Sequence, residues 1–129
     1  MIENLNQEQL AGILETIPME ISFVNEDDLV KFWNKHETRI FKRPVAVIGK
    51  SVKNCHPKQS VDKVNQILSD FKAGKRDSAE FWIDLKGRKI YIRYFAVRNK
   101  AGKYLGTLEA TQDITEIKKI EGEKRLLDY

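Results

Sequence analysis

The sequence has few residues that could form a disulfide bond, ligate a metal or hold the chain in a membrane. It has one cysteine and two histidines, and it has no apolar run of about 18 residues. One cysteine excludes an intramolecular disulfide, and the missing apolar run argues against a membrane span. No basic segment followed by an apolar one marks a secretory leader. We therefore expect a soluble cytoplasmic protein with no membrane partner.

Positive charge does not gather at any one place in the sequence. The net charge of +4 arises from 23 basic and 19 acidic residues, and the basic clusters at 42–43, 72–76 and 86–89 are short and separated. Nucleic-acid binding requires a focused basic face, so we predict no nucleic-acid partner. No P-loop, dinucleotide fingerprint, metalloprotease helix or nucleophile elbow occurs, and we predict that the protein is not an enzyme.

Hydrophobic periodicity divides the 129 residues into helices and strands within one domain. Apolar side chains recur at helical spacing over 6–17 and 60–73. Alternation or β-rich composition predicts strands over 19–25, 29–33, 79–85, 89–98 and 103–113. Helices separate from strands that are joined by short turns are typical of an α+β fold with one antiparallel sheet. We divide the chain into an N-terminal helix (1–18), a core (19–113) and a C-terminal output or linker helix (114–129).

Capping residues refine the ends of these helices. Three pairs have the capping-box spacing, in which the first residue caps a helix and the fourth bonds back to it: Asn6/Gln9, Asn34/Glu37 and Asp113/Glu116. They predict helices that begin near residues 6, 34 and 113. Ser60 is expected to cap the helix over 60–73, and Gly74 follows it as a C-cap glycine.

Five stretches in this order resemble the PAS sensor-domain family. They are ETIPMEISFVN, FWNKHETRIF, VIGKSVKNCHP, YLGTLEATQD and the DIT at 113–115. The correspondence covers about residues 8–129 and looks closest to a bacterial subgroup often joined to hemerythrin-like or uncharacterised domains. It implies a five-stranded antiparallel sheet in the order 2-1-5-4-3. Helices at 34–41, about 44–58 and 60–73 would cover one face, with terminal helices flanking the domain.

The resemblance also implies a ligand pocket between the sheet and these helices. Periodicity and the family layout together give its candidate lining: Phe23, Ile40, Phe41, Ile48, Val64, Leu68, Phe81, Ile92 and Leu108. The function implied is sensing or signal transduction, in which a small ligand or a partner at the core biases the terminal helices. A ligand-free interaction module with a filled core is an alternative, and pocket volume separates the two because ligand sites usually occupy some hundreds of Å³.

The adjacent Cys55 and His56 are the candidates for chemistry in the pocket. Flavin-binding light sensors of the family carry a pattern similar to GxNCRFLQ, but Gly49 precedes Cys55 by six residues where that pattern has three. A flavin is therefore disfavoured. Structural zinc requires four ligands, and with His36 the chain offers three cysteine or histidine side chains. No metal site is predicted.

Haem is the remaining cofactor alternative, because one axial histidine or cysteine thiolate can hold it. His56 or Cys55 would be that ligand, and the protein would then be a redox or gas sensor. The competing interpretation is structural: Pro57 occupies an early helical position and His56 simply precedes it. A single histidine or cysteine is a weak indication of a ligand by itself.

The strand over 89–98 indicates self-association. Ile90, Ile92 and Ala96 lie on one side of it, and Tyr91 and Phe95 lie on the other. A sheet with two apolar faces must be covered twice. We expect a homodimer formed through the terminal helices and the outer face of the sheet.

Overall fold

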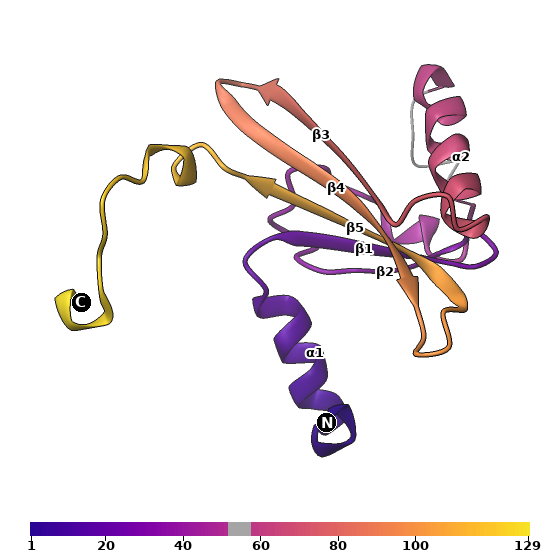
Figure 1. The fold of residues 1–129 in the computed structure, drawn as a ribbon, viewed down its shortest axis with the longest axis horizontal. Coiled ribbons are helices and arrows are strands. Elements are labelled where there is room, and N and C mark those ends of the chain that lie inside the picture. Colours follow the sequence, from indigo (N-terminus) through magenta and orange to yellow (C-terminus); the bar gives the residue numbers. More distant parts are fainter. Residues whose placement is uncertain (52–57) are drawn as a thin grey trace.

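The computed structural model describes residues 1–51 and 58–129. Its centre is one antiparallel sheet (Figure 1). The strands are β1 (Glu20–Asn25), β2 (Val30–Trp33), β3 (Ser78–Leu85), β4 (Arg88–Arg98) and β5 (Tyr104–Asp113). Their order is β2-β1-β5-β4-β3, which confirms the predicted sheet and the α+β class.

Two α-helices accompany the sheet. They are α1 (Gln7–Thr16) and α2 (Lys58–Lys72), and short 3-10 turns occur at Ile2–Asn4, Val45–Val47, Ile117–Lys119 and Leu126–Asp128. Helix α2 lies against one face of the sheet, here called the inner face, whereas α1 projects away from the sheet and carries the N-terminus at its far end (Figure 1). Among the described residues, no helix is long and apolar enough to cross a membrane.

Local sequence accounts for the tight connections. The β3–β4 hairpin closes through Lys86 and Gly87, both with positive φ (51° and 78°), which is the signature of a type I′ turn. Gly106 in β5 has no room for a side chain, because a Cβ there would lie 2.2 Å from the carbonyl oxygen of Val24. A glycine at this position therefore lets β1 and β5 pair closely.

The predicted ends of the two α-helices are largely confirmed. Asn6 and Gln9 form the capping box that starts α1. Gly74 ends α2 in a Schellman arrangement, with its N–H on the carbonyl of Phe71 (3.2 Å) and the N–H of Lys75 on that of Asp70 (2.9 Å). Ser60 is not the N-cap, because α2 begins at Lys58.

The apolar core lies between α2 and the inner face. Val24, Val30, Trp33 and Leu68 form one buried cluster, and Val47 and Val64 pack against it. Phe71, on the same helix as Leu68, is fully buried. The amphipathic spacing read over 60–73 therefore correctly identified the helix that covers the sheet.

The helix predicted over 34–41 is not formed. Residues 36–38 make a turn and the rest of the segment is irregular. Asn34 does not cap a helix, because its side-chain oxygen accepts the N–H of Ile21 (2.7 Å) instead. Lys35 then takes a positive φ of 55°, outside the right-handed helical region. Of the helix implied over about 44–58, the described residues contain the 3-10 turn Val45–Val47.

The helix predicted over 114–129 is also not formed. The segment runs away from the sheet with two 3-10 turns (Figure 1). Asp113 turns its carboxylate onto the N–H (3.0 Å) and hydroxyl (2.6 Å) of Thr115 and pairs with Arg88 at 2.7 Å. The N–H of Ile114 meanwhile bonds the carbonyl of Lys89, which extends the ladder between β4 and β5. Tertiary partners thus occupy the residue that the spacing had marked as a helix cap.

The Asp113 carboxyl should titrate well below the usual range. Hydrogen bonds from Arg88 and then Thr115 lower its pKa from 3.8 to about 2. Its ionised form therefore stabilises the native state above its ordinary pKa, and this contribution is lost as the pH falls towards 2. We expect a carboxyl 13C NMR midpoint near pH 2, and Arg88→Met should raise it towards 3.8. Arg76→Met is the matched control and should leave the midpoint in place. A wild-type midpoint at the ordinary value would contradict this assignment.

Candidate functional site: a buried charge network on the inner face

Polar side chains on β1 and β5 are buried beneath the helical side of the sheet. Glu20 and Ser22 are 4% and 2% exposed, and Thr107 and Thr111 are as deeply buried. Glu20 and Ser22 alternate with apolar residues along β1, a pattern that indicates a solvent-facing polar side. They are buried instead, because Arg39 and the segment around it pack over them.

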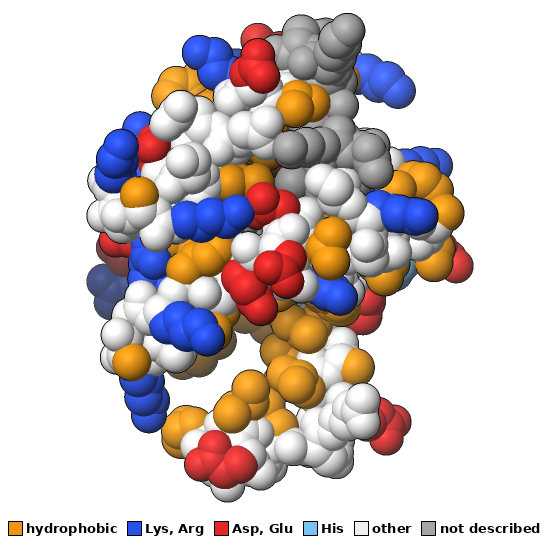
Figure 2. Space-filling view, turned by 90° about the vertical axis from the view of Figure 1, so that its right-hand side faces the viewer, with side chains coloured by type: hydrophobic (Ala, Val, Ile, Leu, Met, Phe, Trp, Pro, Cys, Tyr) orange, Lys and Arg blue, Asp and Glu red, His pale blue; other side chains and the backbone are white. Residues whose placement is uncertain are grey.

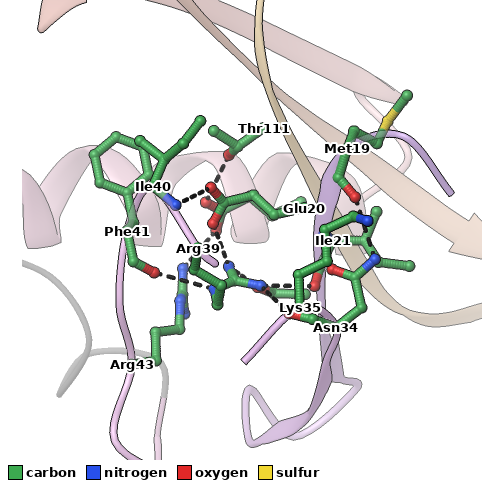
Figure 3. Close-up of polar contacts among 12 residues, drawn as sticks. Met19, Glu20, Ile21, Asn34, Lys35, Arg39, Ile40, Phe41, Arg43 and Thr111 are labelled. Atoms are coloured by element: carbon green, nitrogen blue, oxygen red, sulfur yellow. Dashed lines mark hydrogen bonds and ion pairs between the residues drawn. The ribbon is translucent and has the colours of Figure 1, made fainter. Parts of the chain in front are cut away.

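Arg39 holds this region together (Figure 3). Its side chain is 1% exposed, and each of its three guanidinium nitrogens has a partner inside the chain. Nε donates to the carbonyl of Phe41, Nη1 to the carbonyls of Ile21 and Asn34, and Nη2 to the Ser22 hydroxyl, at 3.0 to 3.2 Å. Nη2 also forms an ion pair with Oε2 of Glu20 at 3.0 Å. Since all three nitrogens are engaged, the role of this arginine is to fix the chain.

Glu20 completes the network from the strand side. Its Oε2 lies 3.0 Å from Nη2 of Arg39, and its Oε1 accepts the N–H of Ile40 at 2.8 Å. Burial raises the pKa of Glu20, and Arg39 offsets part of that rise. Burial likewise lowers the pKa of Arg39, and Glu20 opposes the change. Each charge is therefore tolerated inside the protein because the other is beside it.

A second charged pair lies next to the first. Nη2 of Arg43 is 3.1 Å from Oε2 of Glu109, and their side chains are 9% and 14% exposed. Glu109 is opposite Ser22 in the β1–β5 pairing and opposite Tyr94 in the β4–β5 pairing. Burial, and secondarily the charge of Glu109, raise the pKa of the Tyr94 phenol well above its ordinary value. The inner face thus carries four buried charges that sum to zero.

A small cavity adjoins the second pair. Its volume is about 20 Å³, which is room for roughly one water molecule. The described residues that line it are Val24, Val64, Ile67, Leu68, Tyr94, Thr107 and Glu109. One wall is therefore apolar and comes from α2, whereas the other carries a carboxylate, a phenol and a hydroxyl from the sheet.

A family model for the PAS domain matches residues 10–115. The chain belongs to the PAS domain family. PAS domains are sensory and signal-transduction modules, which is the class of protein predicted from the sequence. Among curated proteins none matches this PAS domain.

Solved structures agree with the family assignment. A C-terminal domain from Streptococcus mutans is 35% identical to this PAS domain, with 91% of each chain covered and a TM-score of 0.84. The PAS domain of BvgS from Bordetella pertussis is 19% identical over 84% of this chain and 85% of that one, with a TM-score of 0.63. A sensory box sensor histidine kinase from Vibrio cholerae is 15% identical over 82% and 89%, with a TM-score of 0.58. The last two likenesses concern the fold.

The PAS domain brings together two of the nine predicted pocket residues, Val64 and Leu68, at the cavity. Phe23 and Leu108 are opposite each other in the β1–β5 pairing and point to the other side of the sheet from Val24 and Thr107. Both side chains therefore lie on the face of the sheet opposite the cavity.

The other predicted pocket residues lie away from the cavity. Ile40, Ile48 and Phe81 are 37%, 40% and 42% exposed. Phe41 and Ile92 are half-buried, and Ile92 is opposite Phe81 on the inner face. Phe81 packs edge-on against Tyr94, with ring centroids 5.7 Å apart. An apolar surface thus continues from the cavity towards the β3 edge.

Cys55 and His56, the candidate haem ligands, lie outside the described residues. The remaining histidine, His36, is exposed and lies against the ring of Trp33. Within residues 1–51 and 58–129, no three histidine, cysteine, aspartate or glutamate side chains gather as a metal site would require.

The charge network itself was missed by sequence reasoning. Arg43 was expected to be a surface or interface salt-bridge residue that could reach an anionic ligand, and Glu109 to be a strand carboxylate on a solvated or paired face. Their largely buried pairing with each other was not foreseen. One indication was available: Glu20 and Ser22 share their strand face with Val24, so that face had reason to be buried.

Removing Arg39 should destabilise this PAS domain strongly. Arg39→Met leaves Glu20 as an uncompensated buried charge, and we expect the free energy of unfolding to fall by about 3 to 5 kcal/mol. Urea denaturation followed by tryptophan fluorescence measures it. The control is Lys72→Met, because Lys72 pairs with Asp28 at the surface, and its loss should be about 1 kcal/mol or less. Equal losses in the two variants would show that Arg39 has no special role.

Proposed function

We propose that this chain is a non-catalytic sensory PAS domain that self-associates and passes a change at its inner face to its terminal segments. Family membership supports the sensory role. The observation that carries the rest is the contrast between a sheet covered on its inner face and a projecting helix α1 with no buried residue. A helix with exposed apolar side chains at the edge of a domain suits a partner surface.

Self-association is supported by the outer face of the sheet, the side opposite α2. It includes Trp82 on the edge strand β3, which is 62% exposed, and Arg93 on β4, whose guanidinium lies 4.9 Å from the Tyr91 ring and 5.6 Å from the Phe95 ring. Nε of Arg93 is buried, with no hydrogen-bond partner in the described part of the chain. Aromatic residues and arginine are the residue types enriched at protein interfaces.

Charge complementarity favours α1 of a second copy as the occupant of this face. Residues 1–30 contain seven acidic residues and no lysine or arginine. In Figure 2 the lower lobe, formed by α1 and the residues before it, shows hydrophobic and acidic side chains. Ile13 on α1 is 47% exposed, so the helix offers both an apolar contact and carboxylates to the aromatic rings and the Arg93 guanidinium of the outer face, which also carries Glu80 and Asp84.

The proposal includes two candidates for the signal that this domain senses. A small ligand at the inner face is the first, and the arginine and carboxylate pair beside the cavity supports it. A partner protein acting on a filled core is the second. The cavity of about 20 Å³ favours this second candidate, because small-molecule sites usually measure some 300 to 1,000 Å³. Native mass spectrometry of the purified chain distinguishes them by showing or failing to show a bound small molecule.

Sedimentation equilibrium tests the proposed dimer. We expect the wild-type chain to be dimeric. Arg93→Glu should raise the dissociation constant by roughly 30-fold or more, because a central interface arginine contributes about 2 kcal/mol and the new carboxylate would face the acidic helix. Trp82→Ala should act in the same direction.

The matched control is Arg76→Glu, which makes the same charge change at a half-exposed arginine beyond the end of α2. It should leave the dissociation constant unchanged. A monomeric wild type, or equal weakening by both charge reversals, would refute the interface.

A further inference from the structure

Helix α1 is attached to the domain through polar contacts at its C-terminal end. Nδ2 of Asn34 donates to the carbonyl of Leu14 at 2.7 Å. Lys35 donates from its backbone N–H to the Glu15 carboxylate (3.0 Å) and from Nζ to the Glu15 carbonyl (2.9 Å). The last carbonyls of a helix lack partners within the helix. Asn34 and Lys35 supply those partners and so set where α1 ends and how it is held.

Asn34 joins this attachment to the charge network. The residue is fully buried, and its side chain also bonds the N–H of Ile21 and the carbonyl of Met19. Its own carbonyl accepts Nη1 of Arg39 at 3.0 Å. Figure 3 shows the residues from Glu20 through Arg39 to Asn34 in continuous contact. Any displacement of the Arg39 guanidinium therefore reaches the residue whose side chain holds the Leu14 carbonyl at the end of α1.

The network also continues towards the cavity. Nη2 of Arg39 donates to Ser22, which is opposite Glu109 in the β1–β5 pairing. The charge of Glu109 also acts on the first ion pair, because it contributes to the pKa shifts of both Glu20 and Arg39. Arg43 also acts on Arg39. The two ion pairs therefore respond to each other's charge.

We propose that Glu20, Arg39, Arg43 and Glu109 form a charge relay through which the pairing of Arg43 with Glu109, beside the cavity, controls how firmly α1 is held. An anion that captures the Arg43 guanidinium, such as a carboxylate or a phosphate, would leave Glu109 without its partner. Arg39 is then drawn towards Glu109, and its bonds to the Asn34 carbonyl and Glu20 weaken. This relay is the internal connection that the proposed sensory role requires. It rests on the proposed function only in taking α1 as the output element.

Amide hydrogen exchange on the full chain tests the relay. The readout is the exchange rate of residues 11–17 at the end of α1, divided by that of β4 so that global opening cancels. Arg43→Met and Glu109→Gln each leave one buried charge unpaired, and each should raise this ratio by about fivefold or more, the size of a typical coupling between sites. The double variant restores charge balance and should return the ratio towards the wild-type value.

The same exchange ratio is used to judge the control variants and the outcomes that would contradict the relay. Lys72→Met and Asp28→Asn each break the ion pair between α2 and the β1–β2 turn, and they should leave α1 unaffected. The relay is overturned if both single variants keep the wild-type ratio, or if the double variant is as perturbed as the singles. Should Arg43→Met lose the protection of β4, the nearly isosteric Glu109→Gln decides the outcome together with the double variant.

Sedimentation of the same samples keeps the two proposals apart. A monomeric chain that shows the exchange pattern retains the relay and loses the dimer, because the ratio is measured within one chain. A dimer without the pattern retains self-association and loses the relay.

Discussion

A single buried guanidinium organises the inner face of this PAS domain. The guanidinium of Arg39 joins β1 to the irregular segment that follows β2 through four hydrogen bonds and one ion pair. A buried arginine is tolerated only when its charge and its donors are satisfied. The acceptors must therefore stay where they are, and that requirement fixes residues 34–43 over β1, the burial of Glu20 and the end of α1 without any regular helix in the segment.

Two arginines of this PAS domain differ in whether their hydrogen-bond donors are already used inside the chain. Arg39 has each of its three guanidinium nitrogens bonded inside the chain, whereas Nε of Arg93 is buried without a partner among the described residues and its guanidinium lies between two aromatic rings. The first can only hold the fold. The second has binding capacity that a carboxylate from outside could use, and it lies on the face where the acidic helix of another copy would meet it.

Features that depend on residues close together in the sequence were predicted, whereas features that depend on distant residues were not. The strands, the β3–β4 turn, the Asn6 cap and the Gly74 cap depend on residues a few positions apart, and all were predicted. The capping-box spacing failed at Asn34 and Asp113. The Asn34 side chain bonds the N–H of the distant Ile21, and the Asp113 carboxylate is shared between the nearby Thr115 and the distant Arg88. Of the predicted pocket residues, Val64 and Leu68 lie at the cavity and follow from the spacing of one helix. The side of the sheet on which Phe23 lies depends instead on which face of β1 is covered, and distant residues decide that.

The sequence by itself determined the sheet and its helical cover, since alternation, helical spacing and turn residues are local properties, and the family resemblance supplied the strand order. Only the tertiary structure decided that Glu20, Arg39, Arg43 and Glu109 belong inside. Charged residues are read as exposed unless their partners are known, and here the partners are 19 positions apart for Glu20 and Arg39 and 66 for Arg43 and Glu109. Folding brings these opposite charges together, and their pairing is what makes their burial possible.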